Sequence, residues 1–472
     1  MNVMKSVFFL VFGCLFSVFA IAGTEFWDWQ TRHKQLVEQK NVAVLPEDLA
    51  YIQNLSDSWE TQAMKLDEYV PLNYSKTMPK KQIINIEKFE SARAQQLTQP
   101  LIEILDTKHI LSERISFDFY QHHFQIKDSS NWQTDLIINQ ANDVSKVWSY
   151  FASLPTEHLI EQMLILKQSL NLNDWDYAVM LFQYSSIWQN DINAQLLQAH
   201  YLLVKSGLNV RIGFANEKVY LLMQTQLFVL NESYVQDSMK KRWYIMDFNN
   251  DITPMENIDL VEKSHSNSKE PLKLLMNPKL NLGGQWQHKL FNYQVGNTQY
   301  DIYLPFQADI LEHYKYYPIL LVDNYINQEI HEIVFQSIYE QIKDKINPRD
   351  EQKTINFLLN FVQTLIKENK ETGNVNKQLF VQQVVFESKG GAQERVLLFK
   401  NLVEKILGNY MMIVLYDNHI STGVKLKTKQ NLSAFHVNLN DYVFADPSYT
   451  HAKLGEKMPL ENSPFKKWLP IY

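Results

Sequence analysis

The last third of the chain holds a histidine and an aspartate that could activate a nucleophile. Gly390 and Gly391 form a turn that opens an apolar helix expected over residues 393–406, and His419 and Asp446 follow at two strand ends. A helix N-terminus favours a thiolate and an oxyanion. An imidazole can take and return a proton, and a carboxylate can fix the imidazole tautomer. The pattern therefore resembles a site for covalent catalysis.

The position at which this pattern requires a nucleophile is Ala392, directly before the helix. An alanine methyl group cannot attack a carbonyl. Ser388 is the other nucleophile that the local sequence offers, but it precedes the glycine pair and misses the helix start. Whether the chain is an enzyme therefore depends mainly on residue 392.

Each signal taken alone also has a structural explanation. A single histidine at a turn is usually structural, and an aspartate before a proline commonly opens a turn. His419 and Asp446 are therefore either a buried hydrogen-bonded pair that maintains the fold or a remnant that still binds a ligand. Glu394 and Arg395 are expected to form a structural pair in the first turn of the helix.

No cofactor or metal site is predicted. His436 lies near His419 in sequence, but the chain has no short-spaced metal-ligand motif such as His-Glu-x-x-His. The sequence also lacks the glycine-rich dinucleotide motif, the P-loop and the Gly-x-Ser-x-Gly elbow.

The elements around these residues indicate an α+β fold, in which helices are followed by a meander of antiparallel strands. Helices are expected over 27–66, 142–153, 155–170, 175–188, 194–206, 328–345, 351–370 and 393–406. Strands are expected over 115–120, 122–126, 209–214, 218–223, 286–303, 410–416, 422–427, 433–438 and 442–445.

Gly207 and Gly408 occupy similar places, because each ends a strong helix and precedes a strand. This similarity suggests an internal duplication, although helix–glycine–strand is also a common connection. The predicted organisation is a helical arm and linker at 23–104, an α+β domain at 105–275 and a second domain at 280–472. The boundary is placed in the polar, turn-rich stretch 251–278.

Several ordered motifs in residues 105–472 resemble those of bacterial exported transglutaminase-like proteins of the Bacteroidetes type. The family's Asp-Cys-Glu-Asp-Arg-Ala-Ile-Leu-Phe corresponds to Gly-Ala-Gln-Glu-Arg-Val-Leu-Leu-Phe at 391–399. Its Tyr-Pro-Gly-His corresponds to Tyr-Asp-Asn-His at 416–419, and its Val-x-Asp-Pro-Thr-Tyr to Phe-Ala-Asp-Pro-Ser-Tyr at 444–449. Its Leu-Leu-Asn-Phe-Val-Gln-Thr recurs at 358–364, and the segments 172–177 and 206–213 are also similar.

The resemblance implies a papain/transglutaminase-like core in which His419 and Asp446 belong to a remnant catalytic triad and Ala392 replaces the cysteine. It also implies that 105–275 is a degenerate repeat of the same domain. The chain departs from the family at further positions, because acidic residues of the family are replaced by Gly391, Gln393 and the Gln-Gln pair at 382–383.

These departures favour a non-catalytic protein that binds or scaffolds at the cell envelope, with a peptide, protein or glycan as its ligand. A reshaped cleft around Ala392, His419 and Asp446 is the expected binding site. Three alternatives stay open. The chain could be a hydrolase or transferase that uses His419 and Asp446 without a thiol, a structural subunit with a filled cleft, or a thiol enzyme inactivated at Ala392.

The N-terminus predicts an exported protein. Lys5 precedes an apolar run at 7–22 that ends in small residues, as in a signal peptide cleaved near Ala22. An uncleaved anchor or lipidation at Cys14 would be the only membrane contact. Cys14 is the only cysteine, so the cleaved chain has no disulfide. The 45 basic and 52 acidic residues include no basic run, which argues against nucleic acid as a partner.

Overall fold

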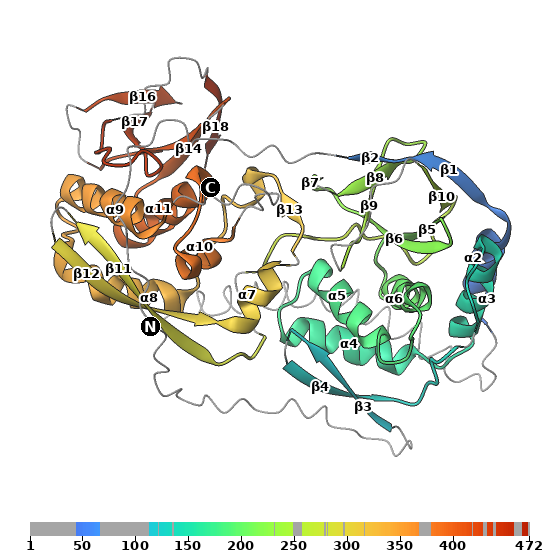
Figure 1. Ribbon diagram of the computed structural model, residues 1–472. Coiled ribbons are helices and arrows are strands. Elements are labelled where there is room, and N and C mark those ends of the chain that lie inside the picture. The colour runs from blue at the N-terminus through green and yellow to red at the C-terminus, as the bar shows by residue number, and fades with distance from the viewer. Residues whose placement is uncertain are drawn as a thin grey trace, which may run out of the picture.

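The computed structural model describes residues 44–66 and 113–456, together with the backbone of 465–470 (Figure 1). Short gaps fall at 121, 135, 231, 249–256, 278–279, 281, 296–297, 316, 368–378, 418, 428–431 and 438–439. The predicted signal peptide and Cys14 lie outside the described residues. No helix in the described part of the chain is long and apolar enough to cross a membrane.

The N-terminal half combines a hairpin, a group of helices and a seven-stranded antiparallel sheet of order β1-β10-β5-β6-β9-β8-β2. The hairpin is β3 (Glu113–Phe119) and β4 (His122–Asp128). The helices are α2 (Pro46–Asp57), α3 (Ala141–Ala152), α4 (Glu157–Ser169), α5 (Asp174–Ser185) and α6 (Ile192–Lys205). The sheet strands are β1 (Trp59–Ala63), β2 (Lys65–Leu66), β5 (Val210–Ala215), β6 (Lys218–Gln224), β8 (Ser233–Gln236), β9 (Arg242–Ile245) and β10 (Asn257–Val261).

The C-terminal half has the same kinds of element and a five-stranded antiparallel sheet of order β16-β17-β15-β14-β18. Its hairpin is β11 (Trp286–Val295) and β12 (Thr298–Gln307). Its helices are α7 (Ala308–Lys315), α8 (Glu332–Ile342), α9 (Glu351–Leu365), α10 (Val381–Glu387) and α11 (Ala392–Leu407). Its strands are β14 (Met411–Tyr416), β15 (Ile420–Val424), β16 (Ala434–Val437), β17 (Asn440–Ala445) and β18 (Phe465–Pro470).

The two halves lie side by side (Figure 1) and share the order of their strands. The run β10-β5-β6-β9-β8 in the first sheet corresponds, strand for strand in chain order, to β18-β14-β15-β17-β16 in the second. All of these neighbours pair antiparallel. Gly207 and Gly408, which follow α6 and α11, both have a positive φ of 87° and 62°, as glycine allows at a helix end. A short pairing of β7 (Val229–Leu230) with β13 (Ile319–Leu320) connects the halves.

Helix α11 forms the centre of the C-terminal half. Every residue from Ala392 to Val403 is buried, and the helix contacts α9, α10, β14 and β15. A helix buried all round belongs in the interior of a domain rather than on its surface. Its start is therefore fixed by packing as well as by the glycine turn before it.

The predicted α+β class is confirmed, with helices and several curled antiparallel sheets. The predicted helix over 27–66 is wrong beyond Asp57, because β1 and β2 follow α2 and join the N-terminal sheet. The described part of the predicted arm is thus integral to that sheet. The helix predicted over 328–345 begins only at Glu332, and the stretch 251–278 contributes β10. The sequence did not predict β1, β2 and β10 because they are short. In β1, polar residues also lie on both faces, so the sequence shows no alternation of polar and apolar residues.

Candidate functional site

His419 and Asp446 are brought together by neighbouring strands of the C-terminal sheet. His419 directly precedes β15 and Asp446 directly follows β17, and these strands pair with Thr422 opposite Ala445. Nε2 of His419 lies 2.7 Å from Oδ2 of Asp446. Both side chains are 1% exposed. The hydrogen bond that the sequence suggested is therefore present, in the interior of the protein.

The Asp446 carboxylate is oriented by the turn that follows it. Its other oxygen, Oδ1, accepts hydrogen bonds from the Ser448 hydroxyl at 2.6 Å and from the backbone N–H groups of Ser448 and Tyr449 at 3.1 and 3.2 Å. Oδ2 is thus directed at His419, in the way that a triad carboxylate orients its imidazole.

Gln363 of α9 holds the same turn from the other side. Its Nε2 lies 3.2, 2.8 and 3.1 Å from the backbone carbonyl oxygens of Asp446, Tyr449 and Ala452, and its Oε1 accepts from His451 N–H at 3.1 Å. The motif at 358–364 contains this glutamine but did not indicate a role for it. Its position inside an apolar helix could have indicated a structural role, because a buried amide needs several hydrogen-bond partners.

Ala392 is the first residue of α11 and is 5% exposed. Arg395 lies one turn further along the same helix face. Its guanidinium donates to the carbonyl oxygens of Ile366 at 2.8 Å and Ser448 at 3.4 Å. The face of α11 that carries Ala392 is therefore turned toward the Asp446 turn.

Glu394 and Arg395, which were expected to have a structural role, both form hydrogen bonds with backbone groups. Glu394 accepts from the N–H groups of Gly391 at 2.8 Å and Leu379 at 3.2 Å, which caps the helix start. Burial raises the pKa of Glu394, and these hydrogen bonds and the Arg395 charge oppose the rise. The two side chains thus link the first turn of α11 to the backbone at Ile366 and at Leu379.

Ala392, His419 and Asp446, around which a reshaped cleft was expected, are all buried. His419 is 1% and Asp446 0% exposed, and the Tyr416 ring lies 6.0 Å from the imidazole ring. Burial also raises the pKa of Tyr416. The pair is therefore buried in the folded chain, which its local sequence does not reveal.

The other positions that depart from the family pattern also lie in packed surroundings. Gln393 is buried in the first turn of α11. Gln382 and Gln383 lie in helix α10 rather than in a loop. Gln383 donates to Glu387 Oε1 at 2.9 Å. Ser388 is buried at the end of α10 with a φ of +51°, away from the start of α11.

The matching strand order identifies the equivalent positions in the N-terminal half. Lys218 closes the β5–β6 turn as His419 closes the β14–β15 turn, and Asp247 follows β9 as Asp446 follows β17. Ile192 begins α6 where Ala392 begins α11. Lys218 is exposed. The N-terminal half therefore repeats the aspartate but has neither an imidazole nor a thiol at the other two positions.

Among the described residues, no group of three or more His, Cys, Asp or Glu side chains could hold a metal ion. His436 forms an exposed pair with Asp441 at 2.9 Å instead.

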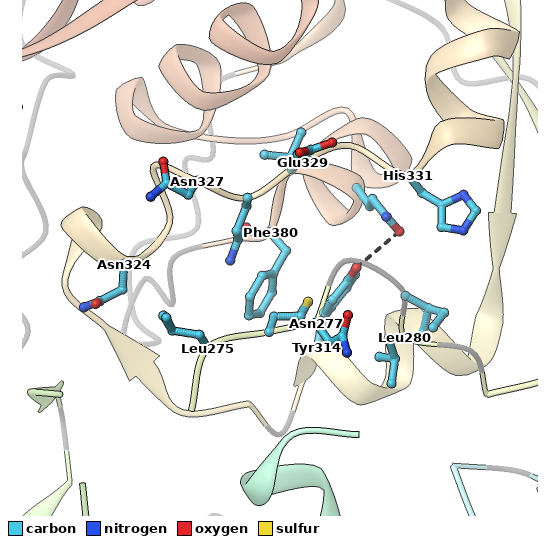
Figure 2. A pocket seen from close by; sticks show the side chains of 14 residues that line it. Leu275, Asn277, Leu280, Tyr314, Asn324, Asn327, Glu329, His331 and Phe380 are labelled. Atoms are coloured by element: carbon cyan, nitrogen blue, oxygen red, sulfur yellow. Dashed lines mark hydrogen bonds between the residues drawn. The ribbon is translucent and has the colours of Figure 1, made fainter. Parts of the chain in front are cut away.

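A cavity lies elsewhere in the C-terminal half (Figure 2). Four segments line it: the connection between the halves, α7, the loop before α8 and the start of α10. Ala392, His419 and Asp446 are not among its lining residues. No single segment contains this cavity, so the sequence did not predict it.

The chain was also compared with known proteins. No protein-family model, no curated protein and no solved structure matches it.

Proposed function

We propose that the chain is an exported, non-catalytic transglutaminase-like protein that binds or scaffolds at the cell envelope. The observation that carries this proposal is the geometry at the start of α11. A buried His419–Asp446 pair has its hydrogen bond at 2.7 Å, and the helix beside the Asp446 turn begins with Ala392. The arrangement keeps two parts of a cysteine triad without the atom that attacks.

The energetics of such triads support a non-catalytic role. Removing the nucleophile of a triad eliminates most of the rate enhancement, so only the contribution of binding and oxyanion stabilisation remains. His419 and Asp446 are also almost inaccessible to a substrate. A buried hydrogen-bonded pair still stabilises the fold, because it satisfies polar groups that would otherwise be costly to bury.

The alternative enzyme functions are a hydrolase or transferase acting on peptide or glycan bonds through His419 and Asp446 without a thiol, and a parent thiol enzyme inactivated at Ala392. The burial of both ionisable groups weighs against the first. The uncharged residues Gly391 and Gln393 beside Ala392 weigh against the second, because they depart from the family independently of the cysteine.

The proposal extends to the origin of the two halves. The shared strand order, the equivalent helices α6 and α11, and the recurrence of an aspartate at Asp247 support a duplicated transglutaminase-like domain. In this interpretation the N-terminal copy has diverged further from a triad, because Lys218 stands exposed at the position of the imidazole.

An acyl-transfer assay on residues 23–472 tests the non-catalytic role. Wild type and His419→Asn are incubated with chromogenic esters, blocked peptides and glycan oligomers, and product release is compared with that of urea-unfolded protein. The proposal predicts that neither protein exceeds the unfolded blank. Turnover by wild type above that blank overturns the proposal, and its loss in folded His419→Asn would identify the acid/base alternative.

A further inference from the structure

Helix α2 is docked on the N-terminal half by a short stripe of buried side chains. It lies against α3, on the side of that half that faces away from the C-terminal half (Figure 1). Its buried residues are Asp48, Tyr51 and Leu55, which follow one another about one turn apart on one face of the helix. Docking that depends on so few side chains can open locally while the rest of the protein stays folded.

Asp48 supplies the charged part of this contact. Its two carboxylate oxygens accept from Lys205 Nζ at 2.7 and 2.6 Å, and Oδ1 also lies 2.9 Å from Nε2 of His265. Lys205 ends α6, and His265 lies in the segment after β10. All three side chains are buried. A buried ionic cluster thus ties α2 to two separate elements of the N-terminal half.

The Tyr51 ring covers two buried imidazoles. Its centroid lies 5.9 Å from that of the His200 ring, in a stacked arrangement, and 5.3 Å from that of the His265 ring. The Tyr51 hydroxyl lies 3.4 Å from His200 Nε2. On the other side, the Trp148 ring of α3 lies 5.7 Å from the His265 ring. Departure of α2 would remove the phenol ring from both imidazoles and admit water to them.

The hydrogen bonds of both imidazoles fit the neutral form of the ring. Nδ1 of His200 accepts from Trp148 Nε1–H at 3.2 Å, and Nδ1 of His265 accepts from the backbone N–H of Asn267 at 3.1 Å. An imidazolium has no acceptor nitrogen, so protonation of either docked ring would set one N–H group against another. Burial, followed by the nearby His265, lowers the pKa of His200 to about 3, although a hydrogen bond with the Val210 backbone acts in the opposite direction.

The other charged and titratable groups around the two rings come from α2, α6 and β5. They are Asp48, Tyr51, Tyr201, Lys205 and Arg211. Asp48 and Lys205 compensate each other's charge at hydrogen-bond distance. Burial raises the pKa of Tyr51 and of Tyr201, so both phenols stay neutral in acid. Arg211 lies over the Trp243 ring at 4.1 Å and donates to Ser264 Oγ at 2.9 Å.

We propose that α2 is a strap that acid releases, and that the helix leaves α3 and α6 when His200 and His265 take up protons. Strand β1 directly follows α2 and pairs with β10 from Trp59 to Ala63, so the released helix stays attached to the sheet. Release uncovers the apolar surface that Tyr51 and Leu55 occupy in the docked state. The inference goes beyond the proposed binding role and does not depend on residue 392.

The direction of the pH effect follows from the proton count of the two states. In the open state each imidazole is hydrated and titrates near its ordinary pKa of about 6.5, which is well above the ordinary range of a carboxyl group. Between about pH 6.5 and pH 4.5 the open state therefore binds more protons than the docked state does. The equilibrium constant for opening rises by up to about tenfold per pH unit for each imidazole that gains a proton.

Hydrogen-exchange mass spectrometry on residues 23–472 between pH 7 and pH 4.5 tests this strap. Exchange rates of peptides from α2, β1 and α11 are divided by the intrinsic rates at each pH. Protection of α2 is expected to fall by about tenfold or more between pH 6.5 and pH 4.5, while β1 and α11 keep theirs. Protection of α2 that stays constant, or that falls no more than that of β1 or α11, overturns the proposal.

The matched variants are His200→Gln and His265→Gln, with His123→Gln as control. A glutamine keeps an acceptor and a donor but does not titrate, so each of the first two variants removes one proton from the linkage. The pH dependence of α2 exchange is expected to become shallower in each, by up to about tenfold per pH unit. His123 is exposed on β4, and its variant should keep the dependence of wild type. Wild-type dependence in either of the first two variants, once folded, overturns its role in the strap.

Discussion

Nε2 of His419 and Oδ2 of Asp446 lie 2.7 Å apart in the interior of the C-terminal half, with both side chains 1% exposed. In a cysteine triad this hydrogen bond orients the base. In this chain the bond satisfies two buried polar groups, and under the proposed non-catalytic function it has no thiol to orient. Its remaining contribution is therefore to stability.

The first prediction concerns Asp446→Asn. The substitution removes a charge that accepts from His419, Ser448 and Tyr449. Losing charge-assisted hydrogen bonds at a buried site is expected to lower the free energy of unfolding by about 2–4 kcal/mol. Urea unfolding followed by tryptophan fluorescence measures this loss.

The control for that prediction is Asp441→Asn in the same sheet. Asp441 pairs with His436 at a similar distance of 2.9 Å, but their side chains are 64% and 62% exposed. An exposed pair contributes little, so a change within about 0.5 kcal/mol is expected. Equal losses in the two variants would contradict a stabilising role for the buried pair.

The second prediction compares the two glycines before α11. A Cβ added at Gly390 would lie 2.9 Å from Glu394 Cβ and 3.2 Å from Ile366 Cγ2, whereas one at Gly391 would meet only Glu394 Oε2 at 3.1 Å. Gly390→Ala is therefore expected to cost about 1–3 kcal/mol through overpacking. Gly391→Ala should cost less than about 1 kcal/mol, because a carboxylate can shift. Thermal unfolding of both variants checks this order, and the reverse order would show that the close approach at Gly390 is unimportant.

The third prediction concerns pH and His200. Burial, and secondarily the nearby His265, lowers the pKa of His200 to about 3. The neutral ring accepts from Trp148 Nε1–H at 3.2 Å and lies 3.4 Å from the Tyr51 hydroxyl. Between pH 6.5 and about 3 the unfolded chain therefore binds one more proton at this position than the folded chain does. As the pH is lowered through this window, the free energy of unfolding is therefore expected to decrease by up to about 1.4 kcal/mol per pH unit.

His200→Gln removes that titration. The variant should be less stable than wild type at pH 7, but its stability should fall less steeply between pH 6.5 and pH 4. His123→Gln is the control, because His123 is 61% exposed and should change neither value. Denaturant midpoints at several pH values decide the matter, and a slope identical to wild type in His200→Gln would exclude a neutral buried imidazole.

The parts of the fold that could be predicted have a local cause. The helices near 142–153 and 194–206, the hairpin at 113–128 and helix α11 all follow from apolar periodicity and turn residues. The closeness of His419 and Asp446 followed from motifs at two strand ends. Strands β1, β2, β8 and β9 were missed because they are short and their burial depends on distant partners.

The parts of the site that were missed depend on long-range packing. Gln363 clamps a turn more than 80 residues away, and no local pattern reports such a partner. The closed surroundings of His419 and the cavity beside Tyr314 are each built from several segments. Sequence motifs indicated which groups meet, but whether solvent or a ligand reaches them depends on side chains from the rest of the half.

The fourth prediction tests whether residue 392 occupies the nucleophile position. Residues 23–472 contain no cysteine, so Ala392→Cys introduces a single thiol. Ala194→Cys is the matched control, because Ala194 lies in the first turn of the equivalent helix α6, is 2% exposed and has no imidazole at the position of His419. Both variants can be alkylated with iodoacetamide from pH 5 to pH 10.

The pH dependence of that alkylation is the most direct test of a silenced transglutaminase-like site. The thiol pKa in Ala392→Cys should lie below its ordinary value of about 8.5 and rise again when His419→Asn is added. Ala194→Cys should show no such lowering. A thiol pKa at residue 392 at or above the ordinary value, and insensitive to His419, would contradict the assignment of Ala392, His419 and Asp446 to one former catalytic site.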